Sequence, residues 1–363
     1  MGTLNFKFFF FVLAVWSSSS AQPPVSTDRI PEPSESAVDS LSIAIMPFAN
    51  NTLDYRVAVV LEAWVPSLLE KNGLAVMTAQ EIRPILRKHR IRSRGWVGFK
   101  DAQMIRNETG ADFLLLGSWD VLKNVVNPEI GFSMRVLDLE HMTIVSAVSF
   151  GATGEDHLGI FELGRISDLG LIASTGLETA INDLLVDKSY SKPGLSNHGC
   201  FKLAIIPLNN YSETIYADNT LANILLSRLI ASGYFVLEPG FVRELGLARE
   251  VAYRGGVDTA SAQVLLDQFG VCQIITGTVE KLDVARGNPS VTVPHVTFGL
   301  RVMDPRNGSV YLMREFEGAG DDHERFFKKN RVHSLVDLSG RLLEKFVQDL
   351  QAANREDILH GKR

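Results

Sequence analysis

The chain has the size and composition of an ordinary globular protein. It contains 363 residues, of which 45% are hydrophobic and 21% charged, and its formal net charge is −6. This length fits two domains, the composition excludes disorder as the main state, and the negative charge disfavours a nucleic acid as partner. With two cysteines in all, a disulfide-dense scaffold and a zinc cluster made of cysteines alone are also excluded.

The amino-terminal segment, residues 1–21, has the pattern of a cleavable signal peptide. Lys7 precedes a nine-residue apolar run at 8–16, which is followed by four serines and Ala21. A membrane span needs about 20 apolar residues, so this run is too short to serve as a permanent anchor. We predict cleavage after Ala21 and an exposed, proline-containing and serine-containing leader at 22–39. No cysteine lies near this region, so we expect no lipid attachment there.

An internal repeat is the most informative feature of the sequence. The segment 43–50 reads IAIMPFAN, and 160 residues later the segment 203–210 reads LAIIPLNN. At this offset 18 of the 81 positions from 42 to 122 are identical to their counterparts, whereas about five are expected by chance. Farther along, the offset becomes 166, because six residues have entered the second copy near 286–294. We predict a duplicated domain with a longer hairpin loop at that insertion.

The periodicity of the first copy predicts its elements in chain order. Residues 41–48 form a continuous apolar run of strand length, ended by a turn at Asn50, Asn51 and Thr52. Residues 55–71 show apolar residues at helical spacing and stop at Gly73. The other predicted elements are strands at 74–78, 111–121, 131–139 and 143–151, and helices at 79–89, 100–109 and 169–186.

The second copy repeats this order. Its predicted strands are 201–207, 234–238, 272–282, 297–304 and 309–318, and its predicted helices are 221–232, 257–268 and 334–351. The order β-α-β-α-α-β-β-β-α predicts an α/β fold of the α+β type, in which helices cover a mixed sheet in each copy. We expect domains at 40–187 and 200–351, a linker at 188–199 and a polar tail at 352–363.

The repeated unit resembles the CsgG-like family. The resemblance rests on the apolar strand ending in Pro47-Phe48-Ala49-Asn50, the segment ADFLLLGSW at 111–119, and the RVLD strand at 135–138. The unit is similar to the domain shared by the curli secretion component, the lipoprotein activators of penicillin-binding proteins and the amino-terminal domain of TolB. The resemblance implies a periplasmic location with possible peripheral association with the outer membrane, protein partners and no enzymatic activity. The chain departs from the family in lacking a cysteine for lipid attachment.

Two acidic stretches with a histidine are the candidates for a metal site. Gly154, Glu155, Asp156 and His157 have their counterparts in a second group, and that group consists of Gly320, Asp321, Asp322 and His323. Carboxylate beside imidazole can bind a metal, but each stretch lies between a strand and a helix, where acids also serve as caps. We therefore predict structural roles, and no metal or cofactor.

A basic patch is the candidate surface for binding. Its residues are Arg83, Arg87, Lys88, Arg90, Arg92 and Arg94. The default interpretation is a solvated helix face; the alternative is a docking surface for an acidic partner or an anionic envelope polymer.

The two cysteines can form one disulfide. Cys200 precedes the first strand of the second copy and Cys272 begins its third strand. If those strands are parallel neighbours, their starts lie side by side, and an oxidising compartment would allow the bond.

Two functions remain open at this point. The first is a non-enzymatic periplasmic interaction protein that acts in assembly, secretion or regulation of envelope machinery by binding envelope proteins or itself. The second is a periplasmic small-ligand binding protein with its site between the two domains. The sequence contains no Gly-x-Ser-x-Gly, Walker or His-Glu-x-x-His motif, so an enzyme has no support.

Overall fold

The computed structural model describes most of the chain from Leu41 onward. The described ranges are 41–52, 54–92, 95–124, 127–156, 164–185, 202–251, 256–284, 293–322 and 331–359. The predicted signal peptide, leader and linker lie outside these ranges. We call the described residues from 41 to 185 the first lobe and those from 202 to 359 the second lobe.

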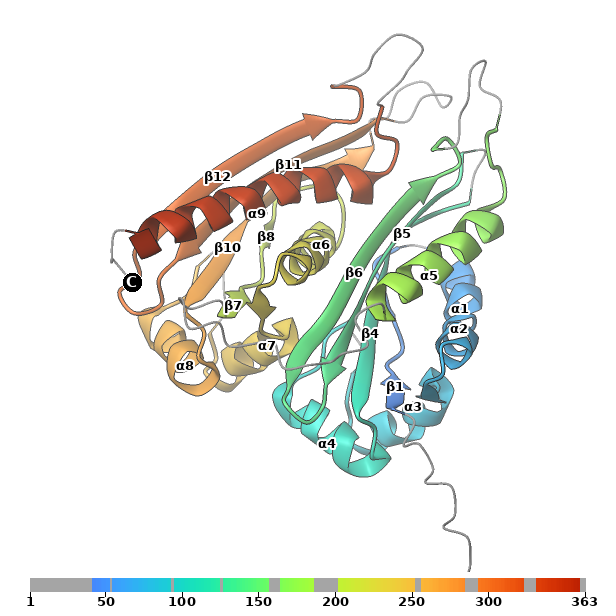
Figure 1. The fold of residues 1–363 in the computed structure, drawn as a ribbon, viewed down its shortest axis with the longest axis horizontal. Helices are drawn as coiled ribbons and strands as arrows, with labels where there is room; N and C mark the ends of the chain where they lie inside the picture. Colours follow the sequence, from blue (N-terminus) through green and yellow to red (C-terminus); the bar gives the residue numbers. More distant parts are fainter. Residues whose placement is uncertain are drawn as a thin grey trace, which may run out of the picture. The chain divides into compact units, whose positions relative to one another are not determined.

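The first lobe is a mixed sheet covered by helices. Its strands are β1 (Ser42–Ile45), β2 (Ala49–Asn50), β3 (Ala75–Met77), β4 (Phe113–Lys123), β5 (Glu129–Asp138) and β6 (Thr143–Thr153). Its helices are α1 (Tyr55–Glu62), α2 (Val65–Lys71), α3 (Ala79–Lys88), α4 (Phe99–Thr109) and α5 (Leu169–Leu185). The strand order is β3-β1-β4-β5-β6, with β2 beside β4; we call this sheet A. Figure 1 shows α1, α2 and α5 on one face of sheet A.

The second lobe repeats this plan. Its strands are β7 (Lys202–Ile205), β8 (Asn209–Asn210), β9 (Phe235–Val236), β10 (Gln273–Val284), β11 (Pro294–Met303) and β12 (Val310–Ala319). Its helices are α6 (Ala217–Ala231), α7 (Pro239–Ala248), α8 (Thr259–Phe269) and α9 (Leu335–Leu359). The strand order β12-β11-β10-β7-β9, with β8 beside β10, defines sheet B.

The strand register repeats together with the sequence. Ile43 pairs with Phe113 in parallel strands, and Leu203 pairs with Gln273 at the same place in sheet B. The antiparallel pairs also share a β-bulge, which inserts Asp120 in β4 and Glu280 in β10. A bulge redirects side chains locally, so both copies aim an acid out of the regular alternation.

The predicted fold class is confirmed, because the chain forms two mixed sheets packed with helices. Several details differ from the prediction, three of them in the helices. The helix expected at 55–71 is divided into α1 and α2, since Pro66 lacks the N–H that would bond to the carbonyl of Glu62. Helix α7 was not predicted, because Pro239 and Gly240 resemble a turn; here Pro239 starts the helix and Glu238 accepts a hydrogen bond from the Gly240 N–H. Helix α9 continues past the predicted end at 351.

The two faces of sheet A belong to different hydrophobic cores. One face packs against α1, α2 and α5, through side chains such as Leu61, Leu69 and Leu177. The opposite face, including Leu114 and Leu116, belongs to the same cluster as the core of the second lobe. The two lobes therefore share a continuous apolar interior.

Helix α6 of the second lobe is responsible for much of this sharing. It packs against β5 and β6 of sheet A as well as β8, β9 and β10 of sheet B. Leu221, Leu225 and Leu226 are all at most 2% exposed. Helix α6 is buried or half-buried along nearly its whole length because it lies against both sheets, and its polar side chains Thr220, Asn223 and Ser227 have partners on sheet A.

Candidate functional site

The described residues concentrate their buried polar groups at the contact between the two lobes, which we call the seam. Side chains from sheet A and from the segment before α4 meet α6, α7 and the start of α9 there. Buried polar groups need partners, and the seam provides them across the lobes.

A buried ion pair joins the lobes. Nε of Arg135, on β5, donates to Oε2 of Glu238 at 2.6 Å, and Nη2 donates to Oε1 at 2.6 Å. Arg135 is 3% exposed and Glu238 is fully buried. Nη2 of Arg135 also donates to the carbonyl of Gly95 at 2.7 Å. This two-point geometry is the strong form of an arginine–carboxylate contact, and losing either partner would leave a buried charge.

A second buried acid, Asp120, lies on β4 of sheet A. Asp120 accepts hydrogen bonds from Asn51 and Ser118, each at 2.9 Å, and from Ser133 at 2.8 Å. Thr220, on α6 of the second lobe, donates to the same carboxylate at 3.4 Å. Burial raises the pKa of Asp120 to about 6, although these hydrogen bonds act in the opposite direction.

Small residues on sheet A let the second lobe approach closely. A Cβ added at Gly131 would lie 2.5 Å from Cγ2 of Val336, and one added at Gly151 would lie 2.6 Å from Cβ of Val336. The Ser227 hydroxyl donates to the Ser149 hydroxyl at 2.8 Å. At these positions the strand face accepts α6 and α9 because its own residues are glycine or serine.

The start of α9 is held by acids of the first lobe. Oε1 of Glu129 accepts a hydrogen bond from the backbone N–H of Leu335 at 2.9 Å. An oxygen of Glu155 lies 2.9 Å from Nδ1 of His333 and another lies 2.9 Å from Arg165. Carboxylates at a helix amino terminus satisfy free N–H groups and the helix dipole.

A small cavity lies in the seam among described residues of both lobes. Its volume is about 20 Å³, and its lining includes Asn51, Trp96, Arg135, Asn223 and Arg243. Such a volume holds about one water molecule. The guanidinium of Arg243 lies 5.5 Å from the ring centre of Trp96, which closes the cavity with a cation–π contact.

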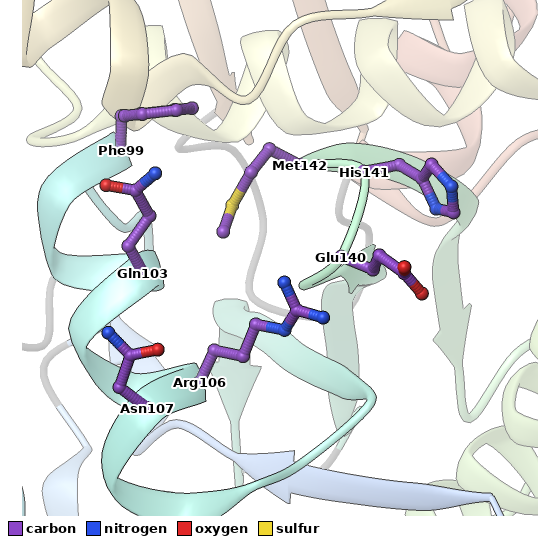
Figure 2. A pocket seen from close by; sticks show the side chains of 7 residues that line it. All are labelled: Phe99, Gln103, Arg106, Asn107, Glu140, His141 and Met142. Atoms are coloured by element: carbon purple, nitrogen blue, oxygen red, sulfur yellow. The ribbon is translucent and has the colours of Figure 1, made fainter.

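A larger pocket lies on the first lobe, between α4 and the turn that joins β5 to β6. Its volume is about 460 Å³. Figure 2 shows Phe99, Gln103, Arg106 and Asn107 along α4 and Glu140, His141 and Met142 on the facing turn. Phe99 is fixed by edge contacts to Phe241 and Phe269 of the second lobe. The pocket thus combines the apolar side chains of Phe99 and Met142 with the cationic side chain of Arg106.

The acids of the candidate metal stretches close turns. Oδ2 of Asp156 accepts the backbone N–H of Thr153 at 2.6 Å, and Oδ2 of Asp322 accepts that of Ala319 at 2.7 Å. His157 and His323 lie outside the described residues. Within the described ranges, no group of three or more His, Cys, Asp or Glu side chains could hold a metal ion.

The basic patch lies on α3 and the chain that follows it. Lys88 pairs with Glu108 at 2.7 Å. Arg83, Arg87, Arg90 and Arg92 are exposed and form no ion pair with other described residues. Arg94 lies outside the described ranges. A docking role for this patch stays a prediction.

The strands that begin after the two cysteines are parallel neighbours, as β7 and β10. Cys272 takes part in a disulfide. Cys200 lies outside the described residues, so the pairing of Cys200 with Cys272 stays a prediction.

Sequence reasoning missed the residues of the seam. Arg135 was noticed only as part of the RVLD repeat, and its counterpart is Arg301. Glu238 replaces Thr78 of the first copy, and this exchange was the available signal. A difference between otherwise equivalent positions marked a residue that serves the contact between copies.

Comparisons with known proteins give distant structural matches. No protein-family model matches the chain, and no curated protein matches it. The PelC dodecamer from Paraburkholderia phytofirmans matches 40% of this chain and 85% of that chain, at 18% identity and a TM-score of 0.26. Lipoprotein GNA1162 from Neisseria meningitidis matches 42% of this chain and 98% of that chain, at 18% identity and a TM-score of 0.31.

The carboxy-terminal domain of LpoB from Escherichia coli also matches, over 31% of this chain and 82% of that domain, at 16% identity and a TM-score of 0.25. Matches at this level do not establish a family, and the CsgG-like resemblance stays a prediction. No helix in the described ranges has both the length and the apolar character needed to cross a membrane.

Proposed function

We propose that the chain is a non-enzymatic interaction protein of the bacterial envelope, which acts by docking to other envelope proteins. The signal-like amino terminus supports export, and one exposed surface of the first lobe supports docking. The finer assignment to assembly, secretion or regulation of envelope machinery is part of the same proposal.

The observation that carries the proposal is an apolar surface on α1 and α5. Tyr55, Val59, Val60 and Leu171 are 67%, 66%, 57% and 53% exposed. Most exposed apolar side chains on a folded protein are scattered and need no explanation. Here three of them occupy one eight-residue helix, and one of these, Val60, is the counterpart of Thr220, which is buried in the seam.

The seam itself shows how such a surface can work. In the second lobe the equivalent helix, α6, contacts sheet A through Thr220, Asn223 and Ser227. Each lobe therefore has a helical layer on its sheet, and the layer of the second lobe is covered by sheet A. At two of these positions the uncovered layer has an apolar residue, Val60 in place of Thr220 and Ala63 in place of Asn223.

A photo-crosslinking experiment in cells tests this function. A photoreactive amino acid at Val59 of the full chain is expected to crosslink to one or a few envelope proteins. The matched control is Leu247, which is 74% exposed on α7 of the second lobe. The proposal fails if Val59 gives no protein adducts, or gives the same adducts as Leu247.

The alternative of a small-ligand binding protein takes a different form once the seam is known. A seam cavity of about 20 Å³ cannot hold a metabolite. The pocket of about 460 Å³ beside α4 is within the usual range of ligand sites. A metabolite that raises the melting temperature of the wild type, and does not do so for Arg106→Gln, would favour this alternative.

A further inference from the structure

Strand β6 leaves one edge of sheet A open, and this edge is separate from the exposed side chains of α1. Within the described residues β6 pairs only with β5. Strand β9 of the second lobe contacts β6 but pairs with β7. We infer that the open edge of β6 binds a single extended segment of a partner protein, which adds one strand to sheet A. The binding site is the backbone of residues 146–153, which pair regularly with β5 on their other side.

The described parts of the two sheets have four edges, formed by β3, β6, β9 and β12. Very short strands and charged side chains are two ways in which proteins prevent an edge from pairing with another chain. Strands β3 and β9 are 3 and 2 residues long, and β12 carries Arg314, Glu315 and Glu317. Strand β6 is 11 residues long and contains neither a charged residue nor a proline. It is therefore the edge that has neither protection.

The exposure of β6 comes from its edge, because both of its faces are covered. Phe150 packs beside Gly176 of α5 on one face, and Ser149 meets Ser227 of α6 on the other. Residues 145–152 are nevertheless all half-buried, whereas residues 129–137 of β5, which contact the same two helices, are all buried. Strand β5 differs in having a neighbour on each side. In Figure 1 β6 lies in front of β4 and β5.

An open edge selects its partner through the backbone. Along an edge strand, alternate N–H and C=O groups point away from the sheet and have no partner in the ladder. An extended segment presents a matching row of donors and acceptors, and strand addition to a sheet edge uses this match. The backbone groups of a helix are already bonded within the helix. The partner segment is therefore extended.

Helix α6 limits the partner to one strand. It crosses β4 at Thr220 and Asn223 and reaches β6 at Ser227. It then continues to Ala231, about 6 Å farther along its axis. Since neighbouring strands are about 4.8 Å apart, the end of α6 extends over the place of the added strand. Two copies paired through their β6 edges would need the same space for both α6 helices, so the partner is a single segment and not a second copy.

The two faces of β6 define the side chains that fit the segment. Val148 and Phe150 pack against the hydrophobic core under α5. Ala147 and Ser149 face the second lobe. Because directly opposite side chains on paired strands touch, we expect an uncharged segment in which apolar residues alternate with small ones. The leader at 22–39 is a poor occupant, since its prolines lack the N–H that a ladder needs.

Peptide binding to the full chain tests the inference. The probe is a synthetic peptide that copies residues 144–152 and carries two added lysines at each end. In an antiparallel pair centred on Val148, this peptide places Ser146 opposite Phe150, so that a small side chain meets a large one. We expect the bound peptide to slow hydrogen–deuterium exchange of residues 146–153. Exchange of β5 should not change, because β5 is already paired on both sides.

The variant Val148→Arg gives β6 the protection that β12 has. Arg314 occupies the equivalent position of β12, and its Nε donates to Oδ2 of Asp349 on α9 at 2.7 Å. The exposed Asp183 on α5 is the counterpart of Asp349, so the new arginine has a partner and the variant is expected to fold. Val148→Arg should weaken peptide binding at least about tenfold. The control Val310→Arg lies on β12, which is already protected, and should leave binding unchanged.

A change in the peptide supplies a control that leaves the protein as it is. Proline in place of the central valine of the peptide removes one N–H and should abolish binding. The inference is overturned if the wild type does not bind the original peptide, or if binding does not protect residues 146–153. It is also overturned if the proline peptide binds as tightly as the original, or if folded Val148→Arg binds as tightly as the wild type.

Two further outcomes separate this inference from its neighbours. Self-association of the wild type that Val148→Arg removes would identify a second copy as the occupant and would overturn the inference. Crosslinking from Val59 tests the proposed function independently, because α1 is not part of the β6 edge. A failure of crosslinking there would leave the peptide result standing, and a failure of peptide binding would leave the proposed function standing.

Discussion

The two lobes have the same strand order, register and bulges, and yet they use their surfaces in opposite ways. The first lobe offers a sheet face of serine and glycine, which the second lobe covers with α6 and α9. The second lobe has Glu315 and Glu317 at the corresponding positions of sheet B, where they are exposed. Duplication thus produced one receiving sheet and one solvent-facing sheet.

The helical layers of the two lobes differ in how far their outward side chains are exposed. Thr220 is 4% exposed, whereas its counterpart Val60 in the first lobe is 57% exposed. Ser227 is also 4% exposed, and its counterpart Ser67 is exposed. The comparison shows that a repeated fold need not repeat its contacts. Side-chain size and charge on a shared backbone decide which face is covered. Substitutions at equivalent positions of the two lobes test this difference.

Removing the ion pair is expected to have the largest effect. Glu238→Ala leaves the buried Arg135 guanidinium without its carboxylate, and we expect a loss of about 3–5 kcal/mol in the free energy of unfolding. The equivalent substitution Thr78→Ala removes only the side-chain cap of α3 and should cost about 1 kcal/mol. Urea denaturation of both variants measures the two costs. Equal losses would mean that the ion pair adds nothing specific to the seam.

The buried acid Asp120 makes the free energy of unfolding depend on pH. Its folded-state pKa of about 6 lies above the ordinary value of 3.8, so the folded state holds this proton more tightly than the unfolded state. Its contribution is therefore favourable at low pH and is lost as the pH rises from about 4 to 6, by roughly 3 kcal/mol in total.

Asp120→Asn cannot ionise and should flatten this part of the stability curve. Glu280→Gln, at the equivalent and exposed bulge position, should leave the curve as it is in the wild type. Urea denaturation from pH 4 to 7.5 provides the comparison. A wild-type curve that parallels the Asp120→Asn curve would contradict the raised pKa.

Filling the receiving sheet face is expected to have an intermediate effect. Gly151→Val would force its side chain against Val336 and should cost about 1–3 kcal/mol. The same residue at the equivalent position of sheet B, in Glu317→Val, meets solvent and should change stability by less than about 0.5 kcal/mol. Thermal or urea unfolding distinguishes them. A tolerated Gly151→Val would show that the contact with Val336 is looser than described.

The smallest expected effect concerns the exposed side of α1, where Val60 lies. Val60→Asp places a charge on an exposed position and should alter the free energy of unfolding by less than about 0.5 kcal/mol. Ser227→Asp puts the same charge against Ser149 inside the seam, where burial without a partner should cost several kcal/mol. If Val60→Asp destabilised the chain as strongly as Ser227→Asp, the first-lobe face would already be covered within the molecule.

Much of the fold followed from local patterns. The helix predicted at 79–89 is observed as Ala79–Lys88 because Thr78 and Glu81 form a capping box. The helix ending before Gly110 was recognised because glycine commonly follows the last turn of a helix. In the structure Gly110 takes a positive φ of 66°, which glycine adopts without strain. Helix α7 was missed because Pro239 and Gly240 suit a turn as well as a helix start, and only the surrounding structure chooses between them.

The sequence alone determined that the chain is a duplicated α+β unit with a specific element order. Those properties depend on residues close together in the chain, and their repetition removed the ambiguity that either copy would carry. The tertiary structure decided the rest. Arg135 and Glu238 are 103 residues apart, and α6 is buried on both sides because it lies against both sheets. No periodicity records such contacts, since they depend on where two already folded surfaces meet.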